Sequence, residues 1–140
     1  MEEDDESWKV RRAAAKTLSA VIVSHPELLS TTLWKSVAPA IIKRFSEREE
    51  SVRLDVFQTF NDLARQTGNI SKGTGQAAVL DNLRAAVPLV LKPLCNHLKD
   101  KSTKTRQGAV GVIREVAATL PGCFNAHADA LVPGLLIALR

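Results

Sequence analysis

Three segments of the chain repeat one pattern, and an internal repeat restricts the choice of fold more than any isolated motif does. The segments align on Val10-Arg11, Val52-Arg53 and Thr105-Arg106. After each arginine, apolar residues recur with the spacing of one helix face, in three aligned copies: Ala14, Leu18, Val21 and Ile22; Val56, Phe60, Leu63 and Ala64; Ala109, Ile113, Val116 and Ala117. This spacing predicts three amphipathic helices of one class, which we name B helices.

A second class of helix, the A helices, alternates with the B helices and carries a proline at one fixed position. The prolines are Pro39, Pro88 and Pro133, and apolar residues stand two positions before each and two and six positions after it. A proline inside a helix removes one backbone hydrogen bond and bends the axis. We therefore expect a kink in every A helix.

The two classes together predict an all-α solenoid. In the order B, A, B, A, B, A, the expected helices cover residues 7–24, 30–46, 48–67, 77–99, 103–120 and 127–140. Helix pairs that recur every roughly 40–47 residues are typical of HEAT and armadillo repeats, which stack into solenoids. We predict one HEAT-repeat array over residues 1–140, with repeats at 30–67 and 77–120 and a single helix at each end. It would be a right-handed superhelical stack of antiparallel helix pairs, and we expect an interior piece of a longer solenoid.

Polar and glycine residues mark the expected helix ends. Ser46 and Glu49 are spaced as a capping box for the second B helix, and Ser102 can cap the third. Gly68 follows the expected end of helix 48–67, where a left-handed residue is favoured. The glycine-rich and polar segment 68–76 is therefore predicted to be a surface loop.

Composition narrows the class of protein further. The chain is 45% hydrophobic and 24% charged, so it can bury a core, and no apolar run is long enough to cross a membrane. Its acidic start differs from a secretory signal, which begins with basic residues. Two cysteines are too few for a disulfide scaffold, which favours a reducing compartment.

The sequence shows no pattern typical of a catalytic or cofactor site. Segment 68–76 has glycines at the spacing of a phosphate-binding loop but lacks the lysine that should follow them. Cys95 and His97 point to opposite sides of one helix, and Cys123 and His127 straddle a helix start. No serine stands in a Gly-x-Ser-x-Gly turn. We therefore expect no metal, no cofactor, no small-molecule substrate and no enzymatic activity.

Charge is distributed unevenly along the chain. Residues 1–6 hold five of the 15 acidic residues, so the remainder carries ten acids against all 19 lysines and arginines. An acidic residue stands six positions before each repeat arginine: Asp5 before Arg11, Glu47 before Arg53, and Asp100 before Arg106. We interpret these six residues as a structural ladder in which each arginine bridges loop carboxylates of stacked repeats.

The remaining basic residues are candidates for partner binding. Those at polar B-helix positions are Lys9, Arg12, Lys16, Arg48, Arg65 and Lys104. A basic surface suits nucleic acid, acidic phospholipid or an acidic protein. Because no aromatic residues are interleaved with these bases, single-stranded nucleic acid has no stacking platform, and a protein partner is favoured. The apolar faces of the two end helices also favour self-association.

Several stretches resemble the cullin-associated, neddylation-dissociated family of HEAT-repeat proteins. They are Asp4-Asp5-Glu6-Ser7-Trp8-Lys9-Val10-Arg11-Arg12-Ala13-Ala14-Ala15-Lys16, Ser36-Val37-Ala38-Pro39-Ala40-Ile41-Ile42 with Arg44-Phe45, Glu47-Arg48-Glu49-Glu50 with Asp55-Val56-Phe57, Lys101-Ser102 with Lys104-Thr105-Arg106-Gln107, Leu120-Pro121-Gly122 and Leu131-Val132-Pro133-Gly134. The similarity follows the order of the chain and is weakest over 68–82.

The resemblance implies a protein of cytoplasm and nucleus that wraps around an unneddylated cullin with its RING subunit. Members of that family compete with the adaptor and substrate-receptor module, shield the cullin lysine that is modified, and promote receptor exchange in SCF-type ubiquitin ligases. The adaptor-displacing hairpin of the family has no counterpart here, so the resemblance implies a cullin-binding scaffold segment without the exchange activity itself. The alternatives from the residues alone are a karyopherin-like or microtubule-associated scaffold and, less favoured, a nucleic-acid-binding solenoid.

Overall fold

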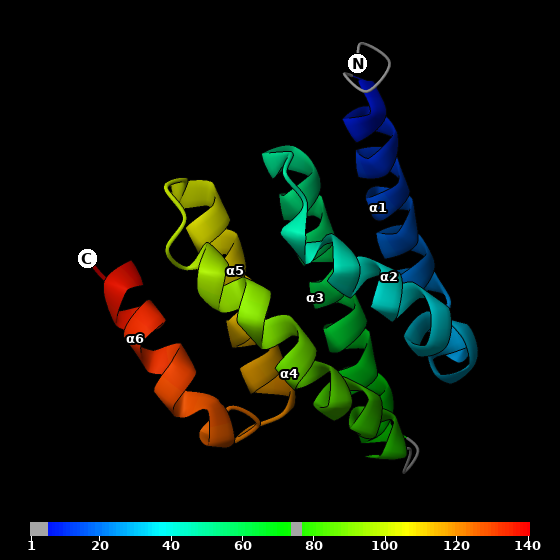
Figure 1. The fold of residues 1–140 in the computed structure, drawn as a ribbon. Coiled ribbons are helices and arrows are strands. Elements are labelled where there is room, and N and C mark those ends of the chain that lie inside the picture. The colour runs from blue at the N-terminus through cyan, green and yellow to red at the C-terminus, as the bar shows by residue number, and fades with distance from the viewer. Residues whose placement is uncertain (1–5, 74–76) are drawn as a thin grey trace.

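A computed structural model describes residues 6–73 and 77–140, and the regular structure of both ranges is helical (Figure 1). The six α-helices are α1 (Ser7–Ser24), α2 (Ala38–Lys43), α3 (Glu50–Gly73), α4 (Leu80–His97), α5 (Thr103–Thr119) and α6 (Ala128–Ala138). Between them lie the π-helix η3 (Leu29–Val37) and the 3-10 turns η2 (Pro26–Leu28), η4 (Arg44–Ser46), η5 (Ala77–Val79) and η6 (Asn125–His127). None of these helices is long and apolar enough to cross a membrane.

The helices form two layers. The B helices α1, α3 and α5 lie in a row, with α3 packed against α1 on one side and α5 on the other (Figure 1). The A helices form the second layer, in which α2 and α4 pack on α3, α4 also packs on α5, and α6 packs on α4. This arrangement confirms the predicted all-α HEAT-repeat solenoid.

The core lies between the two layers and is built from the predicted apolar stripes. Phe45 of η4 meets the rings of Phe57 and Phe60 edge to face, at centroid distances of 5.2 and 5.4 Å. Such aromatic pairs add stability beyond their buried area. Ala14 and Ala117, although part of the stripes, are exposed. Ala14 lies on the open side of α1, which packs against α3 alone among the other B helices.

The first A helix is not one continuous α-helix, contrary to the helix expected over 30–46. Its first part is the π-helix η3, in which the Ala38 amide donates to the Leu33 carbonyl five residues earlier. In an α-helix, the ring of Pro39 would clash with the Lys35 carbonyl and leave it without a donor. The wider π turn immediately before Pro39 changes this hydrogen-bonding register. In contrast, Pro88 and Pro133 lie inside the continuous α-helices α4 and α6.

The surface loop predicted over 68–76 is wrong for residues 68–73, which continue α3 as helix, while 74–76 lie outside the described residues. Gly68 is buried in the helix rather than beyond its end. A Cβ atom at this position would lie 3.0 Å from Cγ2 of Thr119. The glycine thus permits a close approach between α3 and α5. It does not mark the end of α3, as the sequence pattern had predicted.

The two predicted helix caps have different outcomes. The Ser102 hydroxyl caps α5 by accepting from the Thr105 amide at 3.4 Å. Ser46 does not cap α3, because that helix begins only at Glu50. Instead, the Glu47 carboxylate accepts from the Glu49 amide at 3.2 Å. The loop before α3 is therefore organised by Glu47, the acid of the predicted ladder.

Candidate protein-binding surface

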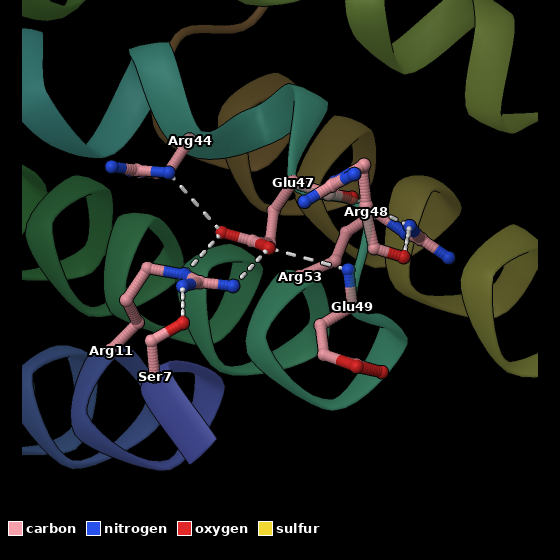
Figure 2. Close-up of polar contacts among 7 residues, drawn as sticks. All are labelled: Ser7, Arg11, Arg44, Glu47, Arg48, Glu49 and Arg53. Carbon is pink, nitrogen blue, oxygen red and sulfur yellow. Dashed lines mark hydrogen bonds and ion pairs between the residues drawn. The ribbon is translucent and has the colours of Figure 1, made fainter. Parts of the chain in front are cut away.

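Glu47 is the centre of a charged corner between the first two B helices. Its side chain is 3% exposed, although it lies in the loop that leads from η4 to α3. Arg11 of α1 donates to it with two nitrogens, Nε to Oε1 and Nη2 to Oε2, both at 2.9 Å (Figure 2). Arg44 approaches the same carboxylate at 3.4 Å. This bidentate geometry is the strong form of a carboxylate–arginine pair and fixes α1 against the next repeat.

The pKa of the Glu47 carboxyl reflects two opposing influences. Burial raises this pKa, but hydrogen bonds from Arg11 and from the Glu49 amide, together with the charges of Arg11 and Arg44, lower it. The net shift is downward from the ordinary value of 4.5, so Glu47 is ionised at neutral pH. The corner therefore carries an ion pair at neutral pH.

Arg53, the equivalent arginine of the second repeat, does not bridge to a loop carboxylate. Its Nη1 donates to the backbone carbonyls of Glu47, at 2.7 Å, and Arg48, at 3.3 Å (Figure 2). Its Nη2 donates to the Thr105 hydroxyl of the next repeat at 2.8 Å. Because Arg53 is only 8% exposed, its guanidinium lies beneath the loop, within reach of backbone oxygens rather than of acidic side chains.

Arg106 repeats the behaviour of Arg53. Its Nη1 donates to the Asp100 carbonyl at 2.7 Å and to the Lys101 carbonyl at 3.1 Å. The Asp100 carboxylate instead accepts from the Ser102 amide at 2.8 Å. The structure thus differs from the predicted ladder: Arg11 and Glu47 are paired through the carboxylate, whereas Arg53 and Arg106 clamp the backbone of their own loops. Asp5, the remaining ladder residue, lies outside the described residues.

Half of the six candidate binding residues are engaged in ion pairs. Arg12 Nε lies 2.8 Å from Asp55 Oδ2 on α3, and Arg65 Nη2 lies 2.7 Å from Glu115 Oε1 on α5. Both pairs join neighbouring B helices and so belong to the packing of repeats. Lys9 contacts Glu6, one turn earlier in the chain, at 2.8 Å.

The other three candidates are exposed: Lys16, Arg48 and Lys104. Their side chains make no ion pair within residues 6–73 and 77–140. Arg48 also lines a hollow of about 330 Å³ at the Glu47 corner, which is surrounded by Arg11, Lys43, Arg44, Ser46, Glu47 and Arg48. Among the described residues around this hollow, four are bases and one is an acid, so the corner is suited to acidic side chains of a partner.

Sequence reasoning missed a second carboxylate that joins repeats. Glu50, in the first turn of α3, accepts hydrogen bonds from the hydroxyls of Ser102 and Thr105 in the next repeat, the latter at 3.0 Å. The bonds from Ser102 and Thr105 hold the pKa of this carboxyl below its ordinary value. The run of four charged residues from Glu47 to Glu50 gave no signal that only its first and last members face neighbouring helices.

Both cysteines and His97 are used in helix packing. His97 Nε2 lies 2.6 Å from the Phe45 carbonyl, and Cys95 Sγ lies 3.7 Å from the Ala130 carbonyl. Burial raises the pKa of both the Cys95 and the Cys123 thiols. In the part of the chain that the structure describes, no three His, Cys, Asp or Glu residues are grouped so that they could hold a metal ion.

The stacked helices, joined by ion pairs between neighbouring repeats, define this chain as a segment of a HEAT-repeat solenoid. Similarity to known proteins supports the family that the sequence of this chain resembles. The chain is 47% identical to cullin-associated NEDD8-dissociated protein 1 of Arabidopsis thaliana, 43% to protein 2 of Rattus norvegicus, and 38% to protein 1 of Dictyostelium discoideum. These alignments cover 97–99% of this chain and 11% of each relative. No protein-family model matches the chain. The chain is therefore a homologue of a segment of the cullin-associated NEDD8-dissociated proteins, and the resemblance is confirmed.

Proposed function

We propose that this chain is a protein-binding scaffold segment of a cullin-associated factor, and that it contacts an unneddylated cullin with its RING subunit. In such a factor it would act without catalysis, in cytoplasm and nucleus, as one part of the surface that regulates the assembly of SCF-type ubiquitin ligases. Because the chain spans only 11% of the relatives' length, the rest of that surface would come from other repeats.

The observation that carries the proposal is the identity of 38–47% with proteins that are named cullin-associated, over nearly the whole chain. The exposed bases add to it. Lys16, Arg48 and Lys104 come from three successive repeat units, on α1, in the loop before α3 and on α5. An acidic partner that runs across the repeats would meet all three. Single exposed charges at an interface rim contribute less than about 1 kcal/mol each, so we expect binding to depend on several of them together.

The test is a binding measurement between the 140-residue chain and a purified cullin–RING complex, with and without NEDD8 on the cullin. The critical variant combines Lys16→Glu, Arg48→Glu and Lys104→Glu. The matched control combines Lys72→Glu, Lys92→Glu and Arg140→Glu, which make the same change of charge at other exposed positions.

We expect the unneddylated complex to bind the chain, the neddylated complex to bind less, and the critical variant to lose about tenfold in affinity. The control variant and each single reversal should stay within about twofold of the original chain. Equal losses of affinity in the critical and control variants would show that binding depends on net charge and not on these three positions. Absence of binding by the original chain would overturn the assignment of a cullin contact to these residues.

A further inference from the structure

The A-helix layer contains an apolar groove between its first two members, which shares Lys43 with the hollow at the Glu47 corner. The groove has a volume of about 460 Å³ and lies between η3–α2 and α4. Two small buried residues, Ala38 and Ala86, line it together with the larger side chains of Trp34, Ile42 and Leu89. Because alanines stand where the two helices face each other, their side chains cannot fill the space between them.

The next pair of A helices is in close contact at one point. Between α4 and α6, Leu98 lies so near Gly134 that a Cβ atom on the glycine would be 2.9 Å from Leu98 Cδ1. In the groove beside α2, the alanines leave space open, and Leu89 is 62% exposed at its edge. The π-helix η3 supplies Trp34 to the groove, and π segments are frequent at functional sites.

Two polar side chains complete the lining, Lys43 from α2 and Asn82 from α4. Neither makes a side-chain hydrogen bond or ion pair with any residue of 6–73 or 77–140. Among the residues that the structure describes, no acidic side chain lines the groove and Lys43 supplies its charge. An apolar pocket with a few polar groups at its edge is the usual form of a site that binds one side chain and fixes its orientation.

We propose that this groove binds a linear peptide segment of a partner protein through one large apolar side chain followed by an acidic residue. The apolar side chain would lie between Trp34 and Leu89, above the two alanines. The acidic residue would pair with Lys43, and the Asn82 amide can both donate to and accept from the peptide backbone. This site shares Lys43 with the basic corner but has its own apolar lining, and the proposal does not depend on a cullin being the partner.

The test is a titration of the isotope-labelled 140-residue chain, followed by NMR, with three capped peptides. Their sequences are Gly-Ser-Phe-Glu-Ser-Gly, Gly-Ser-Phe-Lys-Ser-Gly and Gly-Ser-Ala-Glu-Ser-Gly. We expect saturable shifts of the groove signals, including the Trp34 indole, with the Phe-Glu peptide bound most tightly. An exposed ion pair supports a preference of about threefold to fivefold over Phe-Lys. The Ala-Glu peptide should not saturate.

Two variants distinguish the groove from non-specific binding. Lys43→Glu should reverse the preference between the Phe-Glu and Phe-Lys peptides, which loss of folding could not do. Ala85→Phe places an aromatic ring at the exposed edge of the groove and should abolish binding, whereas Ala118→Phe, at an exposed alanine of α5, should not. Unchanged binding by Ala85→Phe, an unchanged preference in Lys43→Glu, or no saturable shift in the groove would each overturn the proposal.

Discussion

The contact of α1 with α3 and the contact of α3 with α5 occupy the same register of the repeat but are stabilised by different chemistry. The first contains the bidentate Arg11–Glu47 pair. In the second, the equivalent arginine, Arg53, donates to the neutral hydroxyl of Thr105. At the second contact two glycines also face side chains of the neighbouring helix, Gly108 facing Phe57 and Gly68 facing Thr119. The comparison shows that repeats can keep one geometry although the equivalent arginine pairs with a carboxylate at the first interface and with a hydroxyl at the second, where glycines allow close packing.

The largest effect should come from filling the close contact of the second interface. Gly108→Val adds a Cβ that would lie 2.8 Å from Cδ2 of Phe57, whose ring is buried and cannot move aside. Overpacking of this kind costs about 3 kcal/mol. We expect this loss in urea unfolding followed by circular dichroism.

The control for this prediction lies on the same helix. Gly111 has no atom within 4 Å of the position of its missing Cβ, so Gly111→Ala should stabilise the chain by about 0.5–1 kcal/mol through helix propensity. If both substitutions acted alike, packing would not be the property that distinguishes the second interface.

The second-largest effect should come from removing the charge at the first interface. Glu47→Gln keeps the shape of the side chain but replaces the charge-assisted bonds from Arg11, which should cost about 2 kcal/mol. The same unfolding measurement checks this value. Since Arg11 keeps partial contact with water, the loss should be smaller than that from Gly108→Val. A loss below about 0.5 kcal/mol would show that the pair orients the loop without stabilising the fold.

Acid should weaken both interfaces, through a different carboxylate in each. The pKa values of Glu47 and Glu50 are lowered in the folded chain, so their stabilisation is complete above the ordinary value of 4.5 and is lost as pH falls below it. We expect the thermal midpoint to decline below pH 4.5. The decline should be shallower in Glu47→Gln and in Glu50→Gln, and Glu49→Gln, whose side chain is exposed, should decline like the original chain.

The smallest effect should come from the ion pairs at the exposed rim of the B helices. Arg12 is 42% exposed and its partner Asp55 is 17% exposed, so Arg12→Ala should cost less than about 1 kcal/mol. The cost should disappear in high salt, because exposed pairs are screened. A difference that persisted in 1 M sodium chloride would instead point to packing by the aliphatic part of the arginine.

The periodicity of the sequence was sufficient to predict the helices but not the partners of their polar residues. The apolar stripes fix which face of each B helix is buried, and Phe60, Leu63 and Val116 are buried as expected. The spacing of six residues between acid and arginine is real, yet Arg53 uses the carbonyl of Glu47 and not its carboxylate. The choice between these two oxygens depends on how deeply the guanidinium lies beneath the loop, which sequence spacing does not determine.

The glycines of this sequence do not reliably mark the ends of its helices. Gly122 has φ of +83° and stands beyond the end of α5, as glycine at a helix end should. Gly68 instead lies inside α3, where its lack of a side chain matters for contact with Thr119. Contacts with a distant helix decide between these roles, and they become visible only in the folded structure.

The position of α3 between α1 and α5 has a consequence for how the molecule opens. In a solenoid, stability is close to a sum over neighbouring elements, so an end element can detach alone while a middle one cannot. The Thr59 hydroxyl of α3 lies 2.9 Å from the Ala15 carbonyl of α1, and Arg65 of α3 lies 2.7 Å from Glu115 of α5. For α3 to unwind, both of these neighbours must separate from it. The backbone amides of α3 should therefore exchange their hydrogens through complete unfolding of the chain, whereas those of α6, which packs on α4, exchange through local opening.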